Sequence, residues 1–470
     1  MKKKWHNVCM TKKLQTQTEK LTWKEKLLDI RNNKTVLACM LFCSLYLISG
    51  YCKWIEILAC ASALIFMLFL PLKDSLCLFM FLHSFTKSNI AYDSCFMATI
   101  VGYTVILLIK FIIGLKKGTY KWNKTLVYSI IVFYVFGFIG SLFRPWFYNT
   151  LIYLSYLPLF YLIFEMRKEF DIKSGLNYMF AGLITSCCLG LLIFTFPQYQ
   201  YSPLYAGRFS AMFNNPNHIY IRALFLLSYY AYEFLNNNLT SWKFCVIYGV
   251  CATISLSCLS KTGFFMLALM SLIFVVIYLK QDFKKRIINI AIFTIILTAI
   301  CLICYKFIVG IYERIIEAFA SKNMISSLLT DRDDIWKTYL TKIFENPFSL
   351  FLGNGMFTTQ LYSVTQGAPA ETHNFYLFLL YRFGIFGTMI LGYIVYHFIK
   401  ELNPTKPKFI ASLPLIFLLV ESLFDNTMKC YNITYFLFAM MILFLNCKEK
   451  VNKNIETNNQ TQKIKIKVKP

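Results

Sequence analysis

A histidine stands at the entrance to a long apolar segment near the C-terminal end of the chain. His373-Asn374 precedes this segment and follows the only long polar stretch between apolar runs, about sixty residues from Gly310 to Thr372. An imidazole takes up or releases a proton near neutral pH, and ionisable residues beside a bilayer often serve a function. The position favours proton-transfer chemistry at a membrane surface. A lone histidine there is, however, more often a helix cap.

A first cation precedes the start of another apolar run. Residues 207–217 read Gly-Arg-Phe-Ser-Ala-Met-Phe-Asn-Asn-Pro-Asn, and Asn215 before Pro216 predicts a helix N-terminus whose free N–H groups can bind an anion. Arg208 beside that terminus can hold a phosphate through two parallel hydrogen bonds. Taken alone, Arg208 is more typical of an arginine that anchors the end of a membrane span.

A second cation lies inside the long polar stretch. Apolar pairs recur at helical spacing over residues 332–345, which predicts an amphipathic helix that lies on the outer membrane face, with Thr330 or Asp331 as its cap and Asn346-Pro347 as its end. Arg332 falls in the first turn of this helix and Trp336 in the second. Arg332 sits among three aspartates, so a surface ion pair is the alternative reading.

Further polar side chains begin or end apolar runs. Lys261 lies in the tetrapeptide Ser260–Gly263, at the start of one run. Glu421 and Asp425 are four residues apart, so they share one helix face near the outer end of another run. Carboxylates at that depth are costly and are expected to orient His373 or to pair with an arginine. A structural pair with Lys429 or Arg382 is the alternative.

The elements that must position these residues are membrane helices. The chain is 57% hydrophobic and only 15% charged, which is typical of a polytopic membrane protein and not of a soluble one. We therefore predict an all-α integral membrane protein of about 14 transmembrane helices, with one long extracytoplasmic loop containing amphipathic helices. The candidate spans are 35–51, 54–72, 75–86, 94–115, 125–143, 150–164, 175–197, 217–235, 243–259, 263–279, 287–308, 374–399, 409–425 and 431–446.

The net charge of +25 is distributed as the positive-inside rule requires. Basic clusters occur in both tails and in every second loop, so both tails are predicted to be cytoplasmic. This distribution does not follow a nucleic-acid backbone, and we predict no nucleic-acid partner. The predicted divisions are a basic tail (1–34), an N-terminal bundle (35–308), an extracytoplasmic loop (309–372), C-terminal helices (373–446) and a second basic tail (447–470).

The motifs, in their order and spacing, resemble the O-antigen ligase and Wzy-type polysaccharide polymerase superfamily. The resemblance covers roughly residues 200–390. Lys261 departs from it, since these proteins often have arginine at that position, and the loop before His373 is short for a ligase with a large acceptor. The residues that carry the resemblance are Arg208, Phe213, Asn215, Pro216, Asn217, Ser260–Gly263, Arg332, Trp336, Asn346, Pro347, Gly353, Gly355, His373, Asn374, Gly384 and Gly387.

The resemblance implies an enzyme that moves an oligosaccharide from a polyprenyl diphosphate lipid to an acceptor sugar hydroxyl. It implies a location in the cytoplasmic (inner) membrane, with the site on the extracytoplasmic face and without metal or other cofactor. In this scheme His373, Arg208 and Arg332 are catalytic, the arginines neutralising the diphosphate and His373 accepting the proton. The expected substrate-binding residues are Lys261, Asn215, Asn217, Asn374, Trp336, Glu421 and Asp425.

Several readings remain open at this stage. Polymerisation of O-antigen, capsule or exopolysaccharide repeat units is expected first, and ligation of the glycan to lipid A-core is the nearest alternative. Either would place the lipid-linked oligosaccharide, the bilayer, a chain-length regulator and a flippase among the partners. A flippase or transporter would instead show internal repeats or charged residues near the bilayer midplane, and the sequence shows no repeat. A structural scaffold would leave the cations and the histidine on one side unexplained.

The alternating basic loops predict that residues 285 and 366 lie on opposite sides of the membrane. Reporter fusions after Lys285 and after Gln366 should therefore give opposite signals, cytoplasmic for the first and extracytoplasmic for the second. Signals from the same side would contradict both the arrangement of spans and the location of the site.

Overall fold

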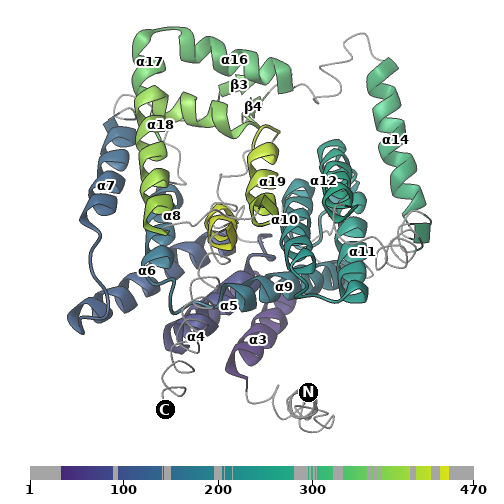
Figure 1. The fold of residues 1–470 in the computed structure, drawn as a ribbon, viewed down its shortest axis with the longest axis horizontal. Helices are drawn as coiled ribbons and strands as arrows, with labels where there is room; N and C mark the ends of the chain where they lie inside the picture. Colours follow the sequence, from purple (N-terminus) through teal and green to yellow (C-terminus); the bar gives the residue numbers. More distant parts are fainter. Residues whose placement is uncertain are drawn as a thin grey trace, which may run out of the picture.

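The protein is described by a computed structural model in which helices dominate (Figure 1). The described residues are 33–87, 94–139, 141, 150–194, 204–205, 207–213, 215–279, 295, 298–299, 302, 304–320, 332–356, 361–363, 368–370, 372–402, 409–424 and 435–443.

The first half of the chain supplies the helices of the bundle. These are α3 (Lys34–Ser49), α4 (Trp54–Phe69), α5 (Leu72–Leu82), α6 (Ser94–Lys116), α7 (Lys124–Ile139), α8 (Thr150–Glu165), α9 (Ile172–Phe194), α10 (Pro216–Leu235), α11 (Ser241–Ser257) and α12 (Lys261–Leu279). The second half adds α14 (Tyr305–Ala320), α16 (Arg332–Phe344), α17 (Pro347–Leu352), α18 (Phe375–Leu402), the 3₁₀ turn η1 (Phe409–Ser412), α19 (Leu413–Glu421) and a helix at 435–443.

Two short antiparallel ribbons accompany the helices. β1 (Leu204–Tyr205) pairs with β2 (Arg208–Phe209), and β3 (Leu361–Ser363) pairs with β4 (Ala368–Ala370). Three described helices are long and apolar enough to cross a membrane: Met97–Lys116, Ile172–Ile193 and Phe375–Glu401. The predicted class, an all-α membrane protein, therefore holds. The count of about fourteen spans stays a prediction.

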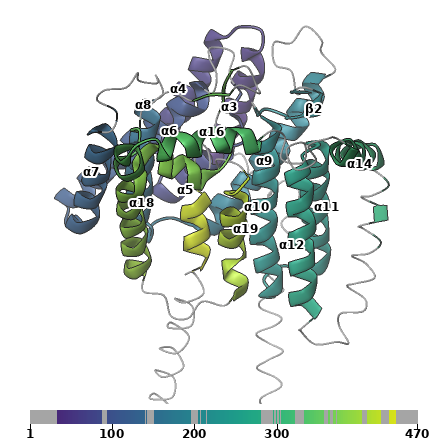
Figure 2. The same ribbon diagram turned by 90° about the horizontal axis from the view of Figure 1, so that it is seen from above.

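α10 lies at the centre of the bundle. It packs against α9, α11, α12 and α19, and nearly all of its residues are buried. Its N-terminus is the one predicted from the sequence: Asn215 is extended, its side chain accepts a hydrogen bond from the Asn217 N–H at 2.8 Å, and Pro216 occupies the first turn. Figure 2 shows α10, α11 and α12 running side by side.

α16 occupies the segment where the sequence predicts an amphipathic helix. It runs from Arg332 to Phe344, and its buried face consists of Ile335, Tyr339 and Ile343, which pack with Tyr381 of α18. The Tyr339 and Tyr381 rings meet edge-on with centroids 4.8 Å apart. The proposed caps Thr330 and Asp331 lie outside the described residues. The contact of this helix with the membrane face stays a prediction.

The predicted boundary between the bundle and the long loop, at residues 308 and 309, falls inside α14. Apolar residues continue at helical spacing past that point, and Ile311 and Ala318 are buried, while Glu313 and Glu317 lower the hydropathy of the segment. The charges end the apolar run but not the helix. Figure 2 shows α14 along its axis, so it crosses the direction of α11 and α12 beside their ends.

α18 covers the span predicted at 374–399, but it is broken at Gly384, a feature that the sequence analysis does not include. Gly384 has φ 61° and ψ −169°, a conformation almost confined to glycine. Figure 1 shows the chain change direction here: residues 375–383, which we call the α18 arm, lie beneath α16, and the longer part descends beside α7. The apolar stretch of 27 residues thus consists of two helical parts, the α18 arm before Gly384 and a longer helix after it.

The loop at 353–356 satisfies the backbone groups that this break exposes. The N–H of Asn354 donates to the Tyr381 carbonyl at 2.8 Å, and the N–H of Gly355 donates to the Arg382 carbonyl at 2.9 Å. Gly353 makes this contact possible, because a Cβ there would lie 2.5 Å from the Arg382 oxygen and from the Gly384 nitrogen. The 353–356 loop and the break at Gly384 thus pack directly against each other, and we call this contact the α18 joint.

We predict that Gly384→Ala destabilises the protein strongly. An added Cβ would lie 2.5 Å from the backbone of Gly353 and Phe351, and the positive φ alone costs about 1–3 kcal/mol. The melting temperature of the detergent-purified protein should fall, or the variant should fail to accumulate. Gly392→Ala is the matched control in the same helix, since a Cβ there meets nothing within 4 Å. Equal stability of the two variants would contradict the proposed joint.

Candidate active site

The turn that follows α19 collects hydrogen bonds from several candidate residues. Residues 421–424, here called the α19 turn, close the C-terminal end of α19, and the carbonyl groups of Ser422, Leu423 and Phe424 face other elements. The N–H of Phe375 donates to the Ser422 carbonyl at 2.9 Å, and Nδ2 of Asn374 donates to the Leu423 carbonyl at 3.1 Å. A guanidinium N–H of Arg332 donates to the Phe424 carbonyl. Elements far apart in the sequence therefore meet at this turn.

His373 is fixed from both sides. Before it, the Thr372 carbonyl accepts the indole N–H of Trp336 at 2.8 Å, and after it Asn374 binds the α19 turn. His373 itself is half-buried and has φ 45°, a left-handed conformation that is uncommon outside glycine and tends to occur at functional sites. The backbone is thus held in a strained shape that sets the direction of the imidazole.

Arg332 and Trp336 act from one face of α16, because they are four residues apart. Arg332 binds the α19 turn and Trp336 binds the residue before His373, so α16 places the second cation and the histidine in the same region. Trp336 was expected to bind substrate. Its indole N–H donates to the Thr372 carbonyl, and a contact of its ring with substrate stays a prediction.

Arg208 is held by neutral groups. Its Nε donates to the Cys258 carbonyl at 2.7 Å, and its Nη2 donates to the Asn217 side-chain oxygen at 2.9 Å. Asn217 therefore orients Arg208, and Asn215 caps the helix that carries Asn217. Burial lowers the pKa of Arg208, and the positive charges of Arg314 and Arg332 lower it further. The guanidinium groups of Arg314 and Arg332 are thus each close enough to interact with that of Arg208.

The tetrapeptide Ser260–Gly263 forms the start of α12. The Ser260 hydroxyl accepts the Gly263 N–H at 3.2 Å, and Lys261 is the first residue of the helix, half-buried. Gly263 lets α12 approach α10, because a Cβ there would lie 3.0 Å from the Tyr220 ring. The Phe265 ring lies 6.3 Å from that of Phe424, so α12 also borders the α19 turn.

Glu421 is fully buried and links α19 to α10. Its Oε1 accepts the Tyr220 hydroxyl at 2.6 Å, a partner that the sequence does not suggest. Asp425 and Lys429 lie outside the described residues. Arg382, the other expected partner, donates to the Met356 carbonyl at 2.5 Å and so belongs to the α18 joint.

Arg314 lies near Arg208, and the sequence analysis does not name it. A guanidinium N–H of Arg314 donates to the Leu259 carbonyl, next to the Cys258 carbonyl that Arg208 binds. It was assigned to a polar loop because the charges of α14 interrupt the apolar run. The spacing of Ile308, Ile311 and Ile315 is helical, and this pattern could have identified the helix and its cation.

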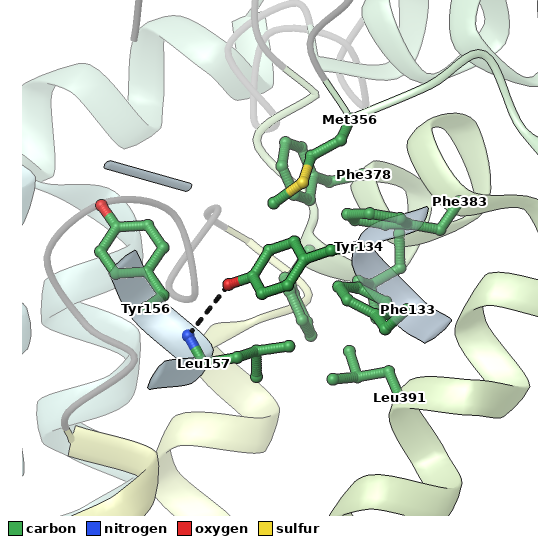
Figure 3. Close-up of a pocket in the computed structure, with 10 residues that line it drawn as sticks. Phe133, Tyr134, Tyr156, Leu157, Met356, Phe378, Phe383 and Leu391 are labelled. Carbon is green, nitrogen blue, oxygen red and sulfur yellow. Dashed lines mark hydrogen bonds between the residues drawn. The ribbon is translucent and has the colours of Figure 1, made fainter. Parts of the chain in front are cut away.

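An apolar pocket lies under the α18 arm, between this arm, α7 and α8 (Figure 3). It encloses about 460 Å³ of empty space, part of it open to the outside. The Tyr134 hydroxyl in its wall accepts the Leu157 N–H at 3.3 Å, and Arg382 lies over the Phe378 ring at 5.1 Å. The lining residues are Phe133, Tyr134, Tyr156, Leu157, Met356, Phe375, Phe378, Leu379, Phe383 and Leu391.

A family model described as O-antigen ligase matches residues 244–392. This range of the chain therefore resembles an O-antigen ligase domain. This match confirms the superfamily indicated by the motifs and supports membrane glycan processing of the ligase or polymerase type. No curated protein and no solved structure matches the chain.

The O-antigen ligase domain carries most of the site. The matched range includes Lys261, Arg314, Arg332 and His373, whereas Arg208 on its loop and the α19 turn lie outside it. The domain thus depends on flanking helices to bring its polar residues together. In the described part of the chain, no group of three or more His, Cys, Asp and Glu side chains could hold a metal ion.

We predict that Asn374→Leu lowers the free energy of unfolding by about 1–3 kcal/mol. The substitution removes the donor to the Leu423 carbonyl and the side-chain oxygen that accepts the Leu377 N–H. Tyr376→Phe is the matched control, since its hydroxyl donates to Leu419 of the same helix but is exposed; its loss should stay below about 1 kcal/mol. Thermal unfolding in detergent measures both. A larger effect from Tyr376→Phe would show that the α19 turn does not anchor the histidine segment.

Proposed function

We propose that this protein transfers an oligosaccharide from a polyprenyl diphosphate lipid to a sugar hydroxyl, and that it polymerises repeat units of a surface polysaccharide. The acceptor oxygen forms a bond to the anomeric carbon of the donor, and the bond from that carbon to the diphosphate oxygen breaks. The acceptor proton passes to His373, and polyprenyl diphosphate leaves with the bonding electron pair. The O-antigen ligase domain supports this reaction class.

The observation that carries the proposal is the gathering of guanidinium groups near the His373 segment, where none of them takes part in a described ion pair. The ion pairs among the described residues are Lys173–Glu233 and Lys342–Glu345, so Arg208 and Arg332 bind only neutral acceptors there. Guanidinium groups keep their charge at any physiological pH and match the geometry of phosphate oxygens. Such a group of cations favours a polyanionic substrate, and a diphosphate fits it.

The apolar pocket under the α18 arm supports a lipid-linked donor. Phe375, Phe378 and Phe383 of the arm line it, and the arm begins two residues after His373. A molecule with an apolar chain and a charged head can therefore place the chain near this pocket while its head lies near the cations. Lys261 at the start of α12 adds a positive charge for the glycan or diphosphate.

We place the reaction on the extracytoplasmic face of the inner membrane, because the basic loops put the long loop on that side. A flippase would deliver the donor to this face, and a chain-length regulator would act on the product. Ligation to lipid A-core uses the same donor chemistry. The short loop before His373 favours polymerisation, in which the acceptor is another lipid-linked repeat unit.

We predict that His373→Ala abolishes most polymer synthesis while donor binding is retained. Loss of a general base typically costs about a hundredfold to ten-thousandfold in rate. His397→Ala is the matched control, since His397 lies in the same α18 helix near its opposite end, against Tyr393 and Tyr396. The assay measures polymer length, membrane abundance and the rate with a purified lipid-linked donor.

Arg208→Lys and Arg332→Lys belong to the same experiment. Lysine is preferred to alanine because both arginines also satisfy backbone carbonyls, and each variant should lose about a hundredfold to a thousandfold in rate. A well-expressed His373→Ala variant that makes full-length polysaccharide at the normal rate would refute the proposed role of this histidine.

A further inference from the structure

Two arginines from different elements bind neighbouring carbonyl groups of one turn. Arg208, from the loop before α10, donates to Cys258, and Arg314, from α14, donates to Leu259. Successive residues have Cα atoms only about 3.8 Å apart, so both guanidinium groups are anchored at one place. The turn leads directly through Ser260 into Lys261, and Leu259 has φ 47°. The carbonyl groups of this turn therefore bind Arg208 and Arg314 close in the chain to a third cation, Lys261.

This arrangement has an electrostatic cost that nothing among the described ion pairs offsets. The positive charges of Arg314 and Arg332 both lower the pKa of Arg208, so each of them repels the Arg208 guanidinium. Glu313 and Glu317 lie on the same helix as Arg314, but the described ion pairs include neither. Like charges are kept together at this cost where an anion is to be bound.

We propose that Arg314 is a third cation of the transfer site, and that it binds the polyprenyl diphosphate formed when the bond to the sugar breaks. The proposal rests on the proposed function. The diphosphate of the donor is esterified at both ends and carries about two negative charges, which Arg208 and Arg332 balance. On release its terminal phosphate keeps the oxygen that had joined it to the sugar, and the charge on that oxygen brings the total toward three negative units at neutral pH. Arg314 matches this additional charge.

Arg314 has donors to spare for this role. A guanidinium carries five N–H groups, and one described hydrogen bond, to Leu259, occupies one of them. The attachment of α14 does not depend on this side chain alone, because Ile311 and Ala318 are buried. A cation that binds the charge developing on the leaving diphosphate stabilises the transition state more than it stabilises the bound donor.

The inference predicts a division between kcat and KM. In Arg314→Gln, kcat should fall at least about tenfold, while KM for the lipid-linked donor changes less than about threefold. Arg314→Lys keeps the charge and should recover part of kcat. Lys306→Gln is the matched control, an exposed cation of the same helix, and it should behave as the unmodified protein. Melting temperatures of all variants establish that the fold is retained.

A second readout does not require turnover. Geranylgeranyl diphosphate imitates the product, and geranylgeranyl monophosphate is its less charged comparator. Calorimetry on the full-length protein in detergent should show the diphosphate binding at least about tenfold more weakly to Arg314→Gln, with a smaller change for the monophosphate. The inference is overturned if diphosphate binding and kcat are unchanged, or if only KM rises.

The two proposals fail in different ways. If Arg208→Lys and His373→Ala abolish transfer but Arg314→Gln is fully active, the role of Arg314 is wrong and the proposed function stands. If the unmodified protein transfers nothing from a polyprenyl diphosphate donor, the proposed function is wrong. In that case weakened diphosphate binding in Arg314→Gln would still support an anion site at α14, and unchanged binding would refute it.

Discussion

The proposed site depends on one constraint, namely that the carbonyl groups of the α19 turn need hydrogen-bond donors from other elements. A helix that ends inside a membrane protein must find donors for its last carbonyls, because little water is available to satisfy them. Here the donors are the backbone of Phe375, the amide of Asn374 and the guanidinium of Arg332. The same hydrogen bonds therefore hold the segment of His373, the proposed general base, and Arg332 in fixed positions relative to α19. The negative end of the helix dipole also favours a cation there.

Backbone carbonyl groups also position the three arginines of the proposed site. Arg208, Arg314 and Arg332 are each bound through backbone carbonyls, and none of the described ion pairs includes them. A carbonyl orients a guanidinium without cancelling its charge, whereas a carboxylate would do both. The three guanidinium groups thus keep their positive charge, as the proposed binding of a diphosphate requires. Glu421, the buried carboxylate at the same turn, binds the Tyr220 hydroxyl and joins two helices.

Local signals in the sequence were enough to predict the local structure. Asn215 before Pro216 predicts the start of α10, and the apolar period over residues 332–345 predicts α16. Both signals are local, because helix capping and amphipathicity depend on residues that are close in the sequence. The break at Gly384 was missed, since hydropathy does not report backbone conformation and the residues on both sides are apolar. The 353–356 loop supplies the missing hydrogen bonds from about thirty residues away, a distance that no local pattern spans.

Direct observation of the bound head group tests the central claim, namely that the α19 turn assembles a diphosphate site beside His373. The measurement is a cryo-electron microscopy structure of the full-length protein with a non-transferable analogue of a polyprenyl diphosphate sugar. The diphosphate should lie between Arg208 and Arg332, with the anomeric carbon facing His373 and the isoprenoid chain directed toward the pocket under the α18 arm. A diphosphate bound away from both arginines, or a sugar facing away from His373, would contradict the proposed site.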